Sequence, residues 1–423
     1  MQRYFFILGA NPTLSVSELF SVFKKWKIDH TITDFSSEVL IVSSENTLDA
    51  SVVVKTCGGV VKFGQILDAV TLDESEDRFY EIFSTNNIIN RYIPNVGGKL
   101  HIGISIYNAG GENNYLGLLS KQLKDLNKTV KNNLQQEGKK VGFVQIKDRY
   151  LSSVSVFKNQ LLSHGTEIVL ILTANNIFVG KTLSVQEFEQ FSFRDYGRPA
   201  RDKRSGIMPP KLARMMINLA EVNIDEILLD PFCGSGTILQ EAILLGYKNI
   251  IGTDISNKAI SDTKTNIDWL FAHFHTLVKS SYNIRLNVAD VKNISKFISS
   301  NTVDAIVTEP YLGPPLFRKP DEFVIKNILS EVSNLYFAAF LQFSKILKPG
   351  GTIIIIFPAF EANGKFYFVE ILDKIMKLGF SQQELVQANL RENTPFPLTN
   401  RNTIIYGDRQ QFAKREILSF VKL

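Results

Sequence analysis

The chain has little cysteine, no long apolar run and only a small excess of charge. Cys57 and Cys233 are the only two cysteines among 423 residues. They are too few for a disulfide framework or a cysteine-based zinc site, which favours a reducing, cytoplasmic compartment. The longest apolar runs, such as 168–172 and 352–357, are too short to cross a bilayer, so we predict no membrane association.

Other weak or missing signals narrow the range of functions. The apolar stretch 4–10 is short and leads into a turn, so it indicates a first strand rather than a signal peptide. The net charge of +5 permits a nucleic-acid partner without requiring one. The sequence has no internal repeat, no low-complexity segment and no P-loop. His273 and His275 have no cysteine or carboxylate cluster beside them, so we predict no metal site.

The most informative stretch is 226–241, EILLDPFCGSGTILQE. A short apolar run ends at Asp230, and a helical pattern resumes at Thr237. Between them, Gly234 and Gly236 allow a sharp turn and a close approach of the backbone to a ligand. A helix N-terminus at a strand end attracts anionic groups, and open α/β sheets bind ligands at this edge.

Acids at later strand ends sharpen this interpretation. Leu239 stands where a dinucleotide fingerprint needs a third glycine, which counts against a nicotinamide dehydrogenase. A second predicted strand ends at Asp254, about where a ribose-binding acid stands in such folds. A third ends at Asp290, and a fourth runs into Thr-Glu-Pro-Tyr at 308–311. Together these features favour a site for an adenosyl ligand.

Strands and helices alternate from residue 211 onward, which predicts an α/β domain with a mostly parallel, doubly wound sheet. A strand-like tail near 403–406 can add an antiparallel pair at one edge. The expected strands lie near 227–230, 249–253, 284–289, 303–307 and 352–357. The expected helices lie near 211–221, 237–245, 256–270, 324–347 and 364–378.

The N-terminal half shows two smaller α+β patterns, separated by Gly58-Gly59. In the second, a helix expected near 119–136 has four lysines off its apolar stripe, which form either a solvated face or a contact for RNA phosphates: Lys121, Lys124, Lys128 and Lys131.

Residues 181–210 lack a sustained period and indicate a linker. Its basic side chains favour phosphate contact, and the predicted RNA-binding residues are Arg194, Arg198, Arg201, Lys203 and Arg204.

Several of these motifs resemble a known family. The loop 230–237, the acids Asp254 and Asp290, and the corner 308–311 resemble successive motifs of Rossmann-like S-adenosylmethionine-dependent methyltransferases. The segment 194–220 resembles the entry to the catalytic domain of the THUMP-containing tRNA guanine-N2 methyltransferases.

The opening segment 4–19 resembles the N-terminal ferredoxin-like domain of the same family. The resemblance implies a ferredoxin-like domain (1–58), a THUMP RNA-binding domain (59–180), a linker (181–210) and a Rossmann-like methyltransferase domain (211–423).

The resemblance also implies ligands. The cofactor would be S-adenosyl-L-methionine and the substrate tRNA, methylated on N2 of the guanosine at position ten, and the family allows for a small activating protein partner. Asp254 would accept hydrogen bonds from the ribose and Asp290 from the adenine amine, although acids at strand ends also cap helices. The expected cofactor contacts are Asp230, Pro231, Phe232, Cys233, Gly234, Ser235, Gly236, Thr237, Asp254, Ile255, Asp290 and Val291.

The predicted catalytic corner departs from the family pattern. Amino-methyltransferases of this kind usually have Asp/Asn-Pro-Pro-Tyr, whereas this chain has Thr308, Glu309, Pro310 and Tyr311. Without a gap Thr308 takes the place of the acid; with one deletion Glu309 does, and we favour Glu309 as the proton acceptor. The carbonyl beside Pro310 is a second acceptor, and Tyr311 would stack on the flipped base. A DNA amino-methyltransferase acting on adenine N6 or cytosine N4, and a catalytically silent tRNA-binding protein, remain the alternatives.

Overall fold

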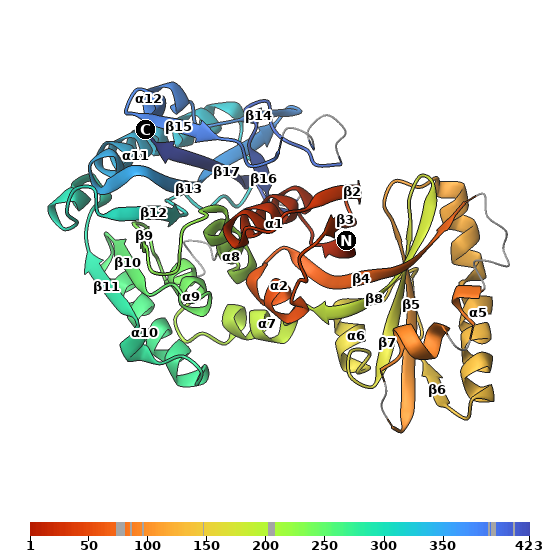
Figure 1. Ribbon diagram of the computed structural model, residues 1–423. Coiled ribbons are helices and arrows are strands. Elements are labelled where there is room, and N and C mark those ends of the chain that lie inside the picture. Colours follow the sequence, from red (N-terminus) through yellow and green to blue (C-terminus); the bar gives the residue numbers. More distant parts are fainter. Residues whose placement is uncertain are drawn as a thin grey trace. The chain divides into compact units, whose positions relative to one another are not determined.

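The computed structural model describes residues 1–72, 81–84, 87–94, 97–146, 148–201, 208–387, 390, 395–408 and 411–423. They form two compact units. The first unit comprises Met1–Val16 and Lys27–Phe188, and the second comprises Ser17–Trp26 and Glu189–Leu423. Each unit is built around one β-sheet, and Figure 1 labels the elements. Within the described ranges, no helix combines the length and apolarity needed to cross a membrane.

The first unit has an eight-stranded sheet in the order β2-β3-β1-β4-β8-β7-β5-β6. Its first six elements follow the β-α-β-β-α-β order of a ferredoxin-like unit. The chain order is β1 (Gln2–Leu8), α1 (Pro12–Trp26, with Ser17–Trp26 grouped in the second unit), β2 (Thr31–Phe35), β3 (Val39–Ser44), α2 (Ala50–Thr56), β4 (Val60–Thr71), η1 (Ile88–Tyr92), β5 (Lys99–Asn108), α5 (Asn113–Gln136), β6 (Lys140–Phe143), α6 (Ser153–Lys158), β7 (Gly165–Leu172) and β8 (Asn176–Val185).

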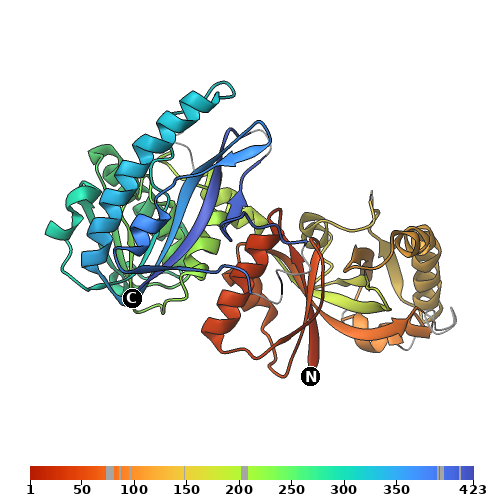
Figure 2. The same ribbon diagram turned by 90° about the horizontal axis from the view of Figure 1, so that it is seen from above.

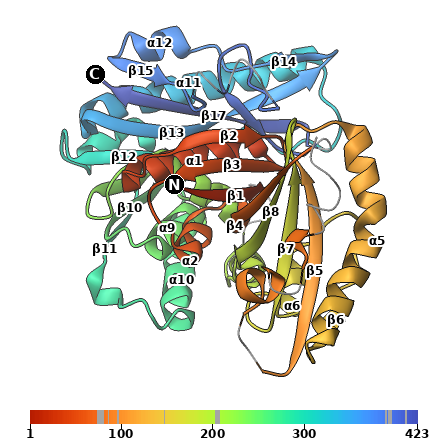
Figure 3. The same cartoon turned by 45° about the vertical axis from the view of Figure 1, so that its right-hand side comes forward.

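Helix α5 covers one face of the strands β5, β6 and β7 (Figure 3). Its predicted apolar stripe is confirmed: Leu119, Leu123, Leu126, Val130 and Leu134 are buried in one cluster with side chains of these strands. The spacing of three and four residues places them on one side of the helix. The four lysines of α5 lie off this stripe and are exposed, as both interpretations of them require.

The second unit has a sheet in the order β11-β10-β9-β12-β13-β17-β15. Its elements are α7 (Phe188–Tyr196), α8 (Pro210–Leu219), β9 (Ile227–Asp230), α9 (Thr237–Leu244), β10 (Asn249–Asp254), α10 (Asn257–His273), η2 (Lys279–Ser281), β11 (Asn283–Val288), η3 (Val291–Lys296), β12 (Val303–Thr308), α11 (Glu322–Ile346), β13 (Leu347–Ala362), β14 (Lys365–Tyr367), α12 (Leu372–Met376), β15 (Phe380–Gln383), β16 (Ile404–Tyr406) and β17 (Ala413–Lys422).

The first five strands of this sheet are parallel to one another, and β17 pairs antiparallel with β13. Counted from β9, they follow the Rossmann-like order 3-2-1-4-5. The long helix α11 runs along one face of the sheet, as Figure 2 shows, and buries Val332, Tyr336 and Phe340 in the core. The predicted mostly parallel α/β fold is confirmed.

Three local expectations differ from the structure. The helix expected over 364–378 forms only as the short α12 (Leu372–Met376), because Asn363 and Gly364 adopt φ values of 53° and 72° and turn the chain back into strand β14. Asn-Gly is the favoured sequence for such a tight hairpin. Residues 181–210, expected to be a linker, contain the end of β8 and helix α7. The tail strand β16 forms the expected antiparallel pair, with β17, but β17 lies inside the sheet, between β13 and β15.

A buried ion-pair cluster ties α7 and α8 to α9, the helix that follows the glycine loop. Glu241 accepts from Arg194 Nε at 2.5 Å and from Arg214 Nε at 2.8 Å. Both guanidinium groups also lie over the ring of Phe191, at 4.5 and 5.0 Å. All three charged side chains are less than a tenth exposed, so both guanidinium charges depend on the single carboxylate of Glu241 for compensation.

Replacing Glu241 by Gln therefore leaves two buried guanidinium groups without their counter-charge. We expect the substitution to lower the free energy of unfolding of the second unit by about 3–5 kcal/mol. Chemical denaturation followed by circular dichroism measures this. Glu370→Gln is the matched control, because Glu370 is 82% exposed and 3.7 Å from its partner Arg401. Equal stabilities of the two variants would contradict the compensating role of Glu241.

Candidate functional site

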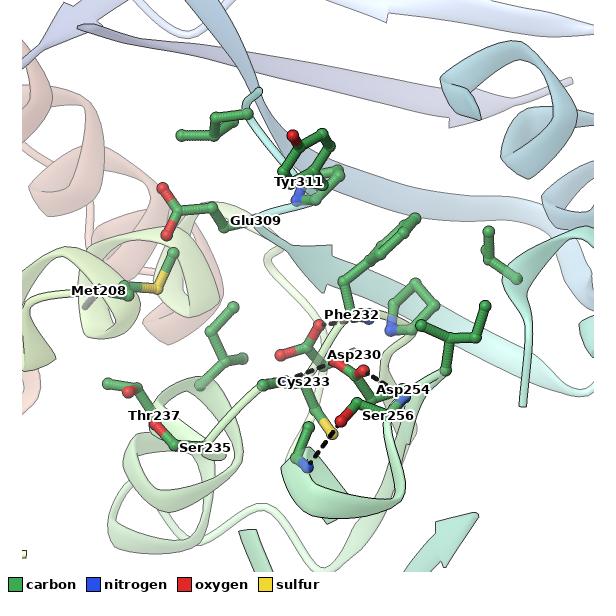
Figure 4. A pocket seen from close by; sticks show the side chains of 18 of the residues that line it. Met208, Asp230, Phe232, Cys233, Ser235, Thr237, Asp254, Ser256, Glu309 and Tyr311 are labelled. Atoms are coloured by element: carbon green, nitrogen blue, oxygen red, sulfur yellow. Dashed lines mark hydrogen bonds between the residues drawn. The ribbon is translucent and has the colours of Figure 1, made fainter. Parts of the chain in front are cut away.

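A cavity of 580 Å³ lies in the second unit, at the carboxyl ends of β9, β10 and β12. The strand order of the sheet reverses between β9 and β12, and ligands of open α/β sheets bind at such a point. The cavity brings together the predicted cofactor contacts except Gly236, and three predicted catalytic residues: Glu309, Pro310 and Tyr311. Figure 4 shows Asp230 and Asp254 close together, with Glu309 and Tyr311 above them in that view.

The loop between β9 and α9 requires glycine at two positions. Gly234 and Gly236 have φ values of +52° and +82°, which side chains with a Cβ rarely adopt. A Cβ on Gly236 would also lie 2.8 Å from Thr263 Cγ2. Gly236 is the N-cap of α9, so its conformation sets where the helix N-terminus meets the cavity.

Two side chains of α10 hold the carbonyl groups of this loop. Thr263 Oγ1 donates to Gly234 O at 2.8 Å, and Asn266 Nδ2 donates to Ser235 O at 2.8 Å. Asn266 also exchanges hydrogen bonds with the backbone of Ala200. Both side chains are fully buried. Their spacing of three residues places them on one face of α10, a signal that was readable in the sequence but missed.

Asp254 organises the loop as well as lining the cavity. Its Oδ2 accepts from the backbone N–H of Gly234 at 3.0 Å, and its Oδ1 accepts from Ser256 N at 2.9 Å. Asp290 caps the short helix η3 by accepting from Lys292 N at 2.9 Å, and it also faces the cavity. The capping and ligand-facing interpretations of these acids are therefore compatible.

Asp230 is a buried carboxylic acid at the end of β9, only 2% exposed. Its Oδ1 accepts from Thr308 Oγ1 at 2.7 Å and from Phe232 N at 3.2 Å. Burial raises the pKa of Asp230 most, the nearby charges of Asp254 and Glu309 raise it slightly, and these two hydrogen bonds lower it; together they place the pKa at about 7. Asp230 therefore changes its charge near neutral pH.

The two interpretations of the catalytic corner are separated by where the side chains point. Thr308 is fully buried, donates to Asp230 and does not line the cavity. Glu309 lines the cavity and forms an ion pair with Arg415 of β17, with Nε 2.5 Å from Oε1. The geometry favours Glu309 as the carboxylate that faces a substrate. Tyr311 is 46% exposed, and its carbonyl is held by Tyr336 Oη at 2.7 Å.

Carboxylates outnumber cations around the cavity. The acids are Asp230, Asp254, Asp262, Asp290 and Glu309, and the cations are Lys258 and Arg415. Lys258 pairs with Asp262, and Arg415 with Glu309. The remaining negative charge favours a ligand that carries positive charge and disfavours a pyrophosphate. Among the described parts of the chain, no group of three His, Cys, Asp or Glu is placed to hold a metal ion.

The predicted RNA-binding arginines need correction. Arg194 and Arg198 are 4% and 3% exposed, so a phosphate cannot reach their guanidinium groups. Arg194 pairs with Glu241, and Arg198 donates to Thr237 Oγ1 beside the cavity. Arg201 is partly exposed and lies 5.0 Å from the ring of Tyr196. Lys203 and Arg204 lie outside the described residues.

Several other residues that line the cavity are not predicted from the sequence. Met208 comes from the segment before α8, and Leu335 comes from α11. Lys258 and Asp262 lie in the first turns of α10 and could have been placed from the helix expected after Asp254. Arg415 reaches the cavity only through the pairing of β17 with β13, and its local sequence carries no signal for this.

The fold and the cavity define a Rossmann-like methyltransferase domain, and comparison with known proteins agrees. A family model described as "RMKL-like, methyltransferase domain" matches residues 198–367, and one described as "DNA methylase" matches 121–265. The crystal structure of TrmN from Thermus thermophilus aligns over the whole of both chains, with a TM-score of 0.54 and 14% identity. At this identity the likeness concerns the fold alone.

Sequence relatives narrow the class. The tRNA (guanine(10)-N2)-dimethyltransferase of Methanocaldococcus jannaschii is 36% identical over 175 residues, which cover 40% of this chain and 47% of the relative. The chain thus spans about half the length of that relative. A probable tRNA (guanine(10)-N2)-dimethyltransferase of Methanothermococcus thermolithotrophicus is 33% identical over 122 residues, which cover 29% of this chain and 72% of the relative. The chain belongs to the family of tRNA (guanine-N2) methyltransferases, which confirms the resemblance inferred from its motifs.

The raised pKa of Asp230 predicts a pH-dependent stability. Because its folded pKa lies above the value of the unfolded chain, the folded protein binds more protons between about pH 4 and pH 7. Stability contributed by Asp230 is full below this window and is lost as pH rises through about 7. Asp230→Asn cannot ionise, so its free energy of unfolding relative to the unsubstituted protein should be higher at pH 8 than at pH 5. Urea denaturation at both pH values measures the difference, and a difference independent of pH would refute it.

Proposed function

We propose that the protein is an S-adenosylmethionine-dependent RNA methyltransferase that modifies the exocyclic N2 amine of a guanosine in tRNA, at position ten. One observation carries the proposal: in a chain of this family, the glycine loop, Asp254 and the Glu309-Pro310-Tyr311 corner converge on one cavity. A DNA amino-methyltransferase has a similar corner, but the sequence relatives favour RNA.

The charge of the cavity supports the cofactor. S-adenosylmethionine supplies a methyl group on a positively charged sulfonium, and the surplus of carboxylates around the cavity suits a cation. Asp230 and Asp254 would lie nearest to the positively charged sulfonium of the cofactor. The N-terminus of α9 and the N–H groups of the loop would face the cofactor carboxylate. Asp254 would hold the ribose and Asp290 the adenine amine, each with the lone pairs that their backbone contacts leave free.

Glu309 would accept the proton that the amine loses on methylation. An exocyclic amine is a poor nucleophile, because its lone pair is delocalised into the ring, and an acceptor at its N–H raises its electron density. Arg415 donates to Oε1 of Glu309, and this contact orients the other carboxylate oxygen, Oε2, which would accept from the amine. The carbonyl before or after Pro310 would accept from the other N–H, and Tyr311 would stack on the base.

RNA contacts outside the cavity stay predictions. The exposed lysines of α5 offer positive charge to phosphates, as do Arg201, Lys203 and Arg204, whereas Arg194 and Arg198 are withdrawn from this role. The THUMP assignment of 59–180, the three boundaries between the four predicted segments, a cytoplasmic location and a small activating protein partner also stay predictions.

The function is tested by transfer of labelled methyl groups from S-adenosylmethionine to an unmodified tRNA transcript, followed by nucleoside analysis. We expect label in N2-methylguanosine or its dimethyl form. A transcript with adenosine at position ten is the control and should take up no label. Label in methyladenosine or methylcytidine, or transfer to DNA alone, would contradict the proposal.

Glu309→Gln tests the proton acceptor. The amide keeps the shape of the side chain but accepts a proton poorly, so single-turnover transfer should fall by about 100-fold or more. Affinity for S-adenosylhomocysteine should change little, which separates chemistry from cofactor binding. Glu226→Gln is the matched control, because Glu226 precedes the amino end of β9, at the opposite edge of the sheet. Full activity of Glu309→Gln would move the acceptor to another residue.

A further inference from the structure

The loop 312–321, between the catalytic corner and α11, exposes an aromatic ring that the proposed mechanism does not use. Phe317 is 95% exposed, more than any other large apolar side chain among the described residues. Moving a phenyl ring from water onto a flat apolar partner is favourable, because apolar surface is removed from water. Arg318 and Lys319 follow directly and are also exposed.

The loop is held at both ends. At its start Tyr336 fixes the carbonyl of Tyr311, and Gly313 has a φ of +107° where a Cβ would lie 2.5 Å from Ile328 Cγ2. At its end Asp321 accepts from Val324 N at 2.9 Å and begins α11. Leu316, next to Phe317, is packed against the core of the second unit.

Proline further restricts this loop. Pro314, Pro315 and Pro320 have fixed φ angles, which lowers the entropy that the chain would lose when a ligand orders it. The exposed ring is therefore carried by a restrained segment that is anchored before and after it.

The position of the loop identifies what the ring can meet. Tyr311, Leu312 and Gly313 line the cavity, and Phe317 follows Tyr311 by six residues. Six residues span at most about 20 Å, so the ring lies within reach of the nucleotides that flank a target in the cavity. A protein partner would need a broad apolar surface, whereas this loop offers one ring beside two cations, the combination that binds single-stranded nucleic acid.

The acids near this loop interact mainly with groups other than its two cations. Asp321 accepts from the first turn of α11, and Glu322 accepts from Asn363 Nδ2 at 3.0 Å and lies 3.8 Å from Lys326. Glu361 pairs with Lys414 at 2.6 Å; Lys414 lowers its pKa most, and Lys319 contributes less. Arg318 and Lys319 form no ion pair among the described residues and add positive charge beside Phe317.

We propose that Phe317 is a stacking platform for an unpaired nucleobase next to the methylated nucleotide, and that Arg318 and Lys319 contact the phosphates of that strand. The inference rests on the RNA methyltransferase function proposed above. Phe317 is thus a positioning residue, which fixes the strand so that the target base enters the cavity beside Tyr311.

The experiment measures equilibrium binding of unmodified tRNA in the presence of S-adenosylhomocysteine, with methyl transfer assayed in parallel. Phe317→Ala should weaken tRNA binding at least about five-fold, the lower limit for loss of one base–aromatic stack. Phe317→Trp should bind as well as the unsubstituted protein, and the fluorescence it adds should be quenched by tRNA. Phe323→Ala is the matched control, since Phe323 is 73% exposed but lies on α11; it should bind normally.

The salt dependence separates stacking from charge. Phe317→Ala should keep the slope of log affinity against log salt, whereas Arg318→Ala with Lys319→Ala should make it shallower. Unchanged tRNA affinity of Phe317→Ala, or an equal loss in Phe323→Ala, overturns the inference. If the unsubstituted protein binds tRNA without transferring methyl groups, the proposed function fails, yet the three phenylalanine variants still decide the stacking role. If it binds no tRNA, both proposals fail.

Discussion

The hydrogen bond from Thr308 to Asp230 joins the two strand ends on which the site depends. β9 and β12 lie side by side in the sheet, and this bond crosses between them directly below the cavity. Both side chains are almost fully buried, so neither has solvent as an alternative partner. The bond fixes the start of the glycine loop relative to the catalytic corner, and it commits Thr308 to the interior.

The inward position of Thr308 is compatible with the amino-methyltransferase activity that we propose, although the corner departs from the usual motif. With Thr308 turned inward, Glu309 is the carboxylate that reaches the cavity, and Arg415 from the antiparallel strand β17 orients it. A glutamate is one methylene longer than the usual aspartate, and the ion pair limits the extra freedom. Asp254 adds negative charge nearby, and Asp230 adds it once the carboxyl ionises, which its burial postpones to about neutral pH. The cavity thus combines a surplus of carboxylates with Glu309, the proton acceptor that we propose.

Much of this architecture could be predicted from the sequence, because its signals are local. Short apolar runs that end at Asp230, Asp254 and Thr308 gave strands β9, β10 and β12, and parallel strands place their carboxyl ends at one edge. The hairpin at Asn363-Gly364 was also readable and was overlooked beside an apparent helical pattern.

The misses were contacts between residues distant in the chain. Arg415 reaches Glu309 only because β17 pairs with β13. Arg194 lies in a basic segment, which predicts a surface contact with phosphate, but in the folded protein Glu241 balances its charge in the interior. Whether Glu309 or Thr308 faced the cavity depended on which one bonded to Asp230, a tertiary contact that no spacing reveals.

The central claim is that this cavity holds the cofactor on its glycine loop and presents a guanine amine to Glu309. The most direct measurement is a crystal structure of the protein with S-adenosylhomocysteine and a tRNA that contains the target guanosine. We expect the cofactor product against the loop 230–237, with its ribose at Asp254, and the guanine N2 within hydrogen-bonding distance of Glu309. A cofactor product bound elsewhere, or a guanine N2 that faces away from Glu309, would contradict it.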